Sequence, residues 1–93
     1  MRILLHPHDW RPQFVNNPEC PGYCFTEAGA WALIADQLEA GHPFEEIKLD
    51  VPRGEPAVVM LINLEPTQRP LYVKVQIGPR IQAIGRSFHY SYH

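Results

Sequence analysis

The segment LYVKVQI (71–77), followed by IQAIGRSFHY (81–90), decides the fold expected for this chain of 93 residues. In 71–77 apolar and polar side chains alternate, which is typical of a strand that buries one face of a sheet. The short connection Gly78-Pro79-Arg80 predicts a turn between the two segments. The two strands are therefore expected to pair as an antiparallel hairpin.

Two further segments upstream have the composition of strands. Residues 47–51 (IKLDV) alternate in polarity, and residues 57–64 (AVVMLINL) are almost continuously apolar, as expected for a strand covered on both faces. The connections between successive strands are short, so neighbours are expected to pair antiparallel. The sequence thus predicts a four-stranded antiparallel meander over residues 47–90.

A single main helix is expected before these strands, over residues 26–41. Thr26 is a suitable N-cap, and Gly41 is a suitable stop. The apolar residues expected to face the sheet follow helical spacing: Trp31, Ile34, Ala35 and Leu38. The predicted fold class is therefore α+β, with one helix packed on the meander.

Residues 1–25 are rich in proline and are expected to form an irregular arm. Proline lacks an amide donor and keeps the preceding residue out of the helical region, so regular structure is disfavoured there. A chain of this length supports one core. We therefore expect a single domain over 1–93, composed of the arm (1–25), the helix (26–41) and the sheet (47–90).

The composition predicts a globular cytoplasmic protein. Hydrophobic residues make up 45% of the chain, yet no apolar run reaches the roughly 20 residues that a membrane span requires. The first residues also lack the long apolar segment of a secretion signal. The formal net charge of −2 provides no general attraction to nucleic acid, so RNA binding would depend on a local group of cations.

The expected hairpin places several polar side chains on one face. Ile84 and Phe88 are four residues apart, so both are expected on the core face. The opposite face then carries a polar group drawn from both strands: Tyr72, Lys74, Ser87 and His89, bordered by Gln76.

Two residues of the last strand do not fit this alternation. Arg86 falls on the core face by parity, and a bulge at Gly85 or a place at the sheet edge would let it reach the polar face. Tyr90 shares the parity of Arg86 and is expected to bury its ring while its hydroxyl reaches the rim.

These residue types are suited to cleavage of RNA without a metal or other cofactor. Lys74 and Arg86 would stabilise phosphate charge, and His89 would act as general acid or base. Substrate contacts are expected from the neighbouring side chains: Tyr72, Gln76, Ser87 and Tyr90. The alternative is an ordinary solvated face, since antiparallel sheets commonly expose polar residues on one side.

The segments LYVKV (71–75) and RSFH (86–89) resemble the C-terminal hairpin of the RelE-like superfamily of small bacterial toxins, in particular its motility quorum-sensing regulator type and related toxin-like proteins. The resemblance covers residues 70 to 91, extends loosely to the helix and does not include residues 1 to 25. It implies a helix on an antiparallel sheet, mRNA cleavage and control by an antitoxin partner. Lys74 and His89 match polar positions of the motif, and Tyr72 is their neighbour.

A non-enzymatic protein of the same fold is the alternative function. Such a protein would be a degenerate toxin, or a phage or operon protein that binds a partner, and the slightly acidic net charge favours it. The partners expected across these interpretations are an antitoxin-like protein, RNA and a second copy of the chain, with no membrane association.

A second group of chemically active residues lies near the N-terminus. His6, His8, Cys20 and Cys24 are the residue types that bind structural zinc, and zinc would order a proline-rich arm. Their spacing matches no recognised zinc motif. Two loop histidines and two free thiols are the simpler interpretation.

Overall fold

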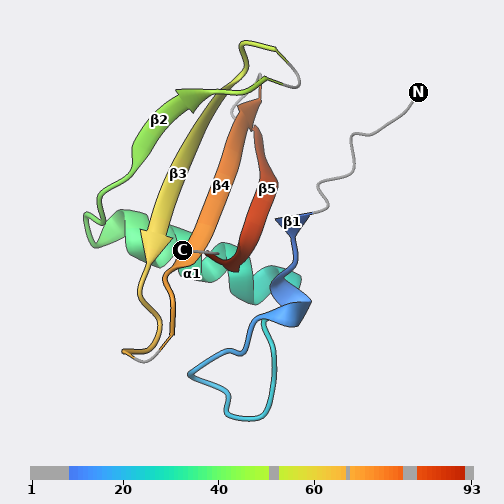
Figure 1. The fold of residues 1–93 in the computed structure, drawn as a ribbon, viewed down its shortest axis with the longest axis vertical. Coiled ribbons are helices and arrows are strands. Elements are labelled where there is room, and N and C mark those ends of the chain that lie inside the picture. The colour runs from blue at the N-terminus through green and yellow to red at the C-terminus, as the bar shows by residue number, and fades with distance from the viewer. Residues whose placement is uncertain (1–8, 51–52, 67, 79–81, 92–93) are drawn as a thin grey trace.

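The computed structural model describes residues 9–50, 53–66, 68–78 and 82–91. Within these ranges the elements are, in chain order, strand β1 (Asp9–Trp10), the short 3-10 helix η1 (Pro12–Phe14), helix α1 (Glu27–Glu39) and strands β2 (Glu45–Lys48), β3 (Pro56–Ile62), β4 (Leu71–Gly78) and β5 (Gln82–Tyr90). Helix α1 crosses behind the sheet and covers one of its faces (Figure 1). The predicted α+β class is therefore confirmed.

The sheet has five strands in the order β1-β5-β4-β3-β2. Strands β2 to β5 pair antiparallel in succession, as predicted, whereas β1 pairs parallel with β5. The prediction of a purely antiparallel four-stranded sheet is therefore wrong, and two residues of the predicted irregular arm, Asp9 and Trp10, form a strand of the sheet. The predicted turn residues Pro79 and Arg80, like Val51, lie outside the described residues.

Trp10 explains why the arm joins the sheet. Its indole ring packs against the ring of Trp31 at 5.1 Å and that of Phe88 at 5.5 Å, measured between centroids. Its Nε1–H donates to the carboxylate of Glu27, which also accepts from Nε1–H of Trp31. Aromatic rings supply a large contact area, so one tryptophan holds this short strand in place.

Helix α1 begins and ends at the predicted signals. The Thr26 hydroxyl accepts a hydrogen bond from the amide of Gly29 at 2.9 Å, and Gly41 follows the helix with a φ of 81°. The predicted apolar stripe is correct only in part. Ile34 is buried, but the side chain of Leu38 is 43% exposed, because the helix turns the small Ala30 toward the core instead.

Removal of the N-cap hydroxyl is expected to destabilise the protein. Thr26→Ala leaves an amide of the first turn without its side-chain acceptor, which costs about 0.5–2 kcal/mol. Urea denaturation measures this change. Thr26→Ser keeps the hydroxyl and is expected to retain most of the stability, so equal losses in the two variants would contradict the assignment.

The core lies between α1 and the sheet. Its largest fully buried side chain is that of Phe88, whose ring meets the rings of Trp10 and Phe25 edge to face. The remaining members come from the arm, the helix and the two central strands: Val15, Ala30, Ile34, Met60, Ile62, Leu71, Val73 and Val75. Strand β3 is not covered on both faces along its whole length, since Leu61 is 52% exposed.

A bulge interrupts the pairing of β4 with β5. Lys74 pairs with Ser87, but the next residue of β4, Val75, pairs with Gly85, so Arg86 is the additional residue. Beyond the bulge every side chain of β5 changes face. The prediction that Ile84 shares the face of Phe88 is therefore wrong, because Ile84 pairs with Gln76.

Candidate functional site

The candidate site lies on the face of the sheet opposite α1, here called the open face. The pairing of β4 with β5 sets Tyr72 opposite His89 and Lys74 opposite Ser87, and Gln76 follows on the same face of β4. We call these five residues the hairpin patch. The structure thus brings together the five polar residues that the parity of the two strands predicted.

Two aromatic rings and one cation form the exposed part of the hairpin patch. The rings of Tyr72 and His89 stack, with centroids 5.5 Å apart and an interplanar angle of 28°. The Lys74 ammonium nitrogen lies 5.8 Å from the centroid of the Tyr72 ring, within the range of a cation–π contact. The patch therefore combines a flat aromatic surface with a positive charge.

The orientation of the His89 ring is set by its own backbone neighbour. Its Nδ1 lies 2.9 Å from the carbonyl oxygen of Tyr90. Because a carbonyl can only accept, the neutral ring carries its proton on Nδ1 and keeps its lone pair on Nε2. Nε2 is therefore the atom of this imidazole that can act as a base.

Gln76 and Ser87 contribute less surface than the sequence suggested. Their side chains are only 5% and 3% exposed, although they lie on the open face. Such buried polar groups form the base of the patch and offer little area for contact with a substrate. Of the residues of this face predicted to contact a substrate, the half-buried Tyr72 offers more surface than either of them.

The two other predicted site residues, Arg86 and Tyr90, are not members of the hairpin patch. Arg86 is the bulge residue, half-buried and adjacent in sequence to Ser87. Tyr90 pairs with Leu71 and packs against the core, so it lies on the helix side and not in the patch. Burial raises the pKa of Tyr90, and the nearby charge of Glu65 adds to the effect.

Strand β1 brings a further cation beside the patch. Asp9 pairs with Ser87 and Trp10 with Phe88, and the amide of Arg11 donates to the Phe88 carbonyl oxygen at 3.2 Å. Continuing this parallel register places Arg11 beside His89. Arg11 was not among the predicted site residues, although the polar–apolar–polar order of residues 9 to 11 is a short strand signal.

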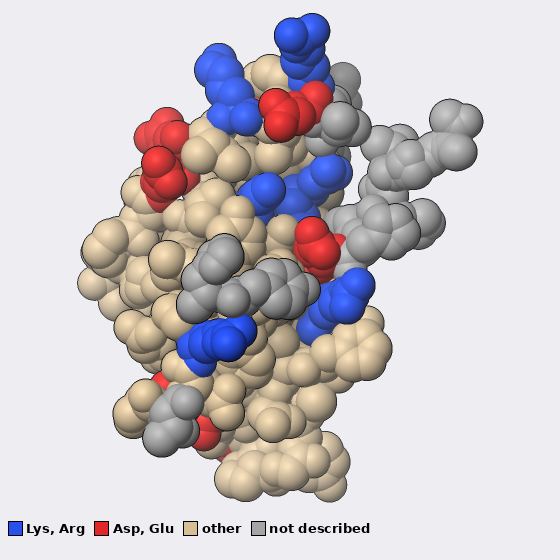
Figure 2. Space-filling view, in the orientation of Figure 1, with Lys and Arg blue, Asp and Glu red and all other residues tan. Residues whose placement is uncertain are grey.

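The distribution of charge on this face is uneven. Figure 2 shows Lys and Arg side chains in the middle of the open face with an acidic group between them, and further acidic side chains at the edge formed by β2. That edge carries the exposed Glu45 and Glu46. Beside the aromatic rings, Lys74 therefore has an acidic neighbour as well, since the exposed Asp9 pairs with Ser87.

The predicted zinc ligands are only partly described. Cys20 and Cys24 are exposed free thiols, and the Cys24 Sγ donates to Asn16 Oδ1 at 3.6 Å. His6 and His8 lie outside the described residues. Within the described ranges, no group of three or more His, Cys, Asp or Glu side chains is arranged to hold a metal ion.

Comparison with known proteins adds no relative. A scan against protein-family models, a search of curated proteins and a search of solved structures each gave no match to this chain. In the part of the chain that the structure describes, no helix has the length and apolar character needed to span a membrane.

Proposed function

We propose that this chain is a toxin-like endoribonuclease that cleaves single-stranded RNA at the hairpin patch without a metal ion. The observation that carries the proposal is the stack of Tyr72 on His89 with the Lys74 ammonium 5.8 Å from the Tyr72 ring, on a face that α1 leaves uncovered. The resemblance of the hairpin to RelE-like toxins supports the same activity.

The aromatic surface suits unpaired bases. A base of any identity can stack on an exposed ring, and such stacking contributes about 1–3 kcal/mol per base. Recognition of single-stranded RNA commonly combines this stacking with cations that bind the phosphates. In the proposed complex, the Tyr72 ring holds a base while Lys74 and Arg11 bind the flanking phosphates.

The chemical step follows from the basic nitrogen of His89. Nε2 removes the proton of the ribose 2′-hydroxyl, and the oxygen attacks the adjacent phosphorus as the bond to the 5′-oxygen breaks. The leaving oxygen takes a proton from water or from the imidazolium. Lys74 and Arg86 stabilise the extra negative charge of the phosphorane, a role that requires cations and no metal ion.

Incubation of the purified protein with single-stranded RNA in excess chelator tests the proposal directly. We expect shorter fragments that end in a 2′,3′-cyclic phosphate, because the attacking oxygen belongs to the RNA itself. An RNA pool that stays intact over a range of protein concentrations would overturn the proposal.

Loss of the Lys74 charge is expected to weaken RNA binding. Lys74→Met removes one phosphate contact but keeps a long apolar side chain, so the slope of log K against log salt should fall by about 0.7. Binding titrations at several salt concentrations measure this slope. Lys48→Met, an exposed change on β2, is the matched control, and an equal effect there would contradict the role of Lys74.

A non-enzymatic, partner-binding function is the second candidate. It is favoured by large apolar side chains that remain exposed, among them Phe44 and Leu61 beside a shallow hollow next to β2. Self-association through this side would appear in size-exclusion chromatography with light scattering as the mass of a dimer. Cleavage of RNA by the wild-type protein would exclude the non-enzymatic form of this candidate.

A further inference from the structure

A groove of about 330 Å³ lies on the helix side of the molecule, away from the open face. Three segments that are distant in sequence form its walls: the turn after η1, one side of α1, and the end of β3 with the two residues that follow. The α1 residues in its lining follow helical spacing along that side: Gly29, Ala32, Leu33, Asp36 and Gln37.

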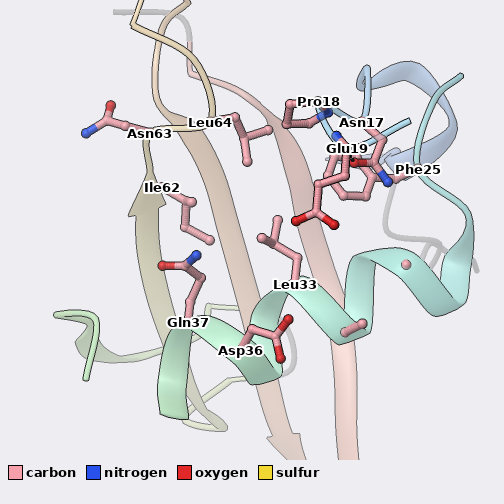
Figure 3. Close-up of a pocket in the computed structure, with 12 residues that line it drawn as sticks. Asn17, Pro18, Glu19, Phe25, Leu33, Asp36, Gln37, Ile62, Asn63 and Leu64 are labelled. Atoms are coloured by element: carbon pink, nitrogen blue, oxygen red, sulfur yellow. Dashed lines mark hydrogen bonds between the residues drawn. The ribbon is translucent and has the colours of Figure 1, made fainter. Parts of the chain in front are cut away.

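The groove has an apolar floor and an acidic rim. Figure 3 shows Leu33 and Leu64 facing each other across it, with the Glu19 carboxylate directed toward the helix. Phe25 and Ile62 complete the apolar lining. Every ionised side chain in the lining is negative, since it contains Glu19 and Asp36 and no Lys, Arg or His.

Within the described ranges, no cation neutralises the acidic side chains of the groove. Among the residues that the structure describes, no side chain forms a hydrogen bond or ion pair with the carboxylate of Glu19 or of Asp36. A second hollow adjoins the groove at Asn17 and Pro18 and adds the carboxylate of Glu65. The negative potential therefore extends from the groove into this second hollow.

The turn that carries Glu19 is held in place before any partner binds. The Asn17 side-chain oxygen accepts from the Glu19 amide at 3.0 Å, and its backbone carbonyl oxygen accepts from the Cys20 amide at 3.0 Å. The opposite wall is a regular helix. A preformed groove of this kind loses little conformational entropy when it is filled.

We propose that this groove binds a short amphipathic segment of a partner protein, in which Lys or Arg flanks a Leu- or Met-sized side chain. The apolar floor accepts the aliphatic side chain, and the carboxylates of Glu19 and Asp36 pair with the cations on either side. RNA is not expected to bind in the groove, because these carboxylates would repel its phosphates. The inference does not depend on cleavage at the hairpin patch, which lies on the other face of the sheet.

Panning a random peptide library displayed on phage against the wild-type protein tests the proposal. We expect enrichment of peptides in which Lys or Arg flanks an aliphatic side chain. Peptides without this pattern, or no enrichment at all, would overturn it. The variants described in the next two paragraphs are first checked by circular dichroism, so that a loss of binding is not mistaken for a loss of fold.

A pair of exposed alanines of α1 provides the matched variants. Ala32 lines the groove and Ala35 does not, yet both are helical and exposed. Ala32→Lys places a cation in the groove and is expected to lower the affinity of the selected peptides by about tenfold or more. Ala35→Lys is expected to leave their affinity unchanged. Equal effects in the two variants would contradict the site.

A second pair of variants tests the charge. Glu19→Gln combined with Asp36→Asn is expected to weaken binding about two- to fivefold per carboxylate and to reduce its salt dependence. The double change Glu45→Gln and Glu46→Gln removes the same charge from β2, outside the groove. An equal loss there would mean that the peptides respond to net charge alone, and the proposal would be wrong.

Discussion

Replacement of His89 by alanine is expected to lower the rate of RNA cleavage by about 10²–10⁴-fold while the fold is retained. The imidazole is the one side chain of the hairpin patch with a ring nitrogen that has a lone pair, which general acid–base catalysis requires. Its ring lies on the open face against Tyr72 and makes no part of the core, which the preceding residue Phe88 fills from the other side. Initial cleavage rates and urea denaturation midpoints measure the two effects separately.

His42 provides a matched control for this prediction. Its Nδ1 lies 2.7 Å from the carbonyl oxygen of the next residue, Pro43, so it makes the same local contact as His89. It lies in the connection between α1 and β2, outside the hairpin patch. We expect His42→Ala to cleave at the wild-type rate. Full activity in His89→Ala, or an equal loss in both variants, would exclude His89 as the acid–base group.

Gly85→Ala is expected to lower the free energy of unfolding by about 1–3 kcal/mol. A Cβ atom at this position would lie 2.6 Å from three atoms of the Trp10 ring, a distance at which one side must move. The ring cannot move easily, because it packs on Phe88 and Trp31 and donates a hydrogen bond to Glu27. Urea denaturation of the variant measures the loss.

A double-mutant cycle identifies the cause of that loss. If the added methyl group acts through the indole ring, Gly85→Ala should cost much less in a Trp10→Ala background, where the space is empty. An equal cost in both backgrounds would mean that the substitution acts through the backbone of the bulge.

The parts of the fold that could be predicted from the sequence are those that local signals determine. Thr26 and Gly41 mark the ends of the helix, and the alternation in 71–77 marks a central strand. A bulge at Gly85 was one of the two alternatives that the sequence offered for Arg86, which breaks the alternation of the last strand, and the pairing of Val75 with Gly85 confirms it. The packing of the Trp10 ring against Gly85 could not be predicted, because it joins residues at opposite ends of the described chain.

The same distinction between local signals and distant contacts applies to the residues of the candidate site. Tyr72 and His89 could be placed opposite each other because they lie on one side of the bulge, where simple alternation still holds. Arg11 could not be placed, since its position depends on the parallel pairing of β1 with β5. The acidic groove was also beyond sequence analysis, because three separate segments contribute its walls.

The parallel pairing of β1 with β5 has a consequence for biosynthesis. Trp10 leaves the ribosome early, whereas Phe88, on which its ring packs, is among the last described residues to be made. During translation the indole therefore has no completed binding surface, and contacts between such distant residues form slowly. Until residues 82–90 have been made, the surface on which this indole packs in the folded protein is incomplete, and transiently exposed apolar surface of this kind favours aggregation.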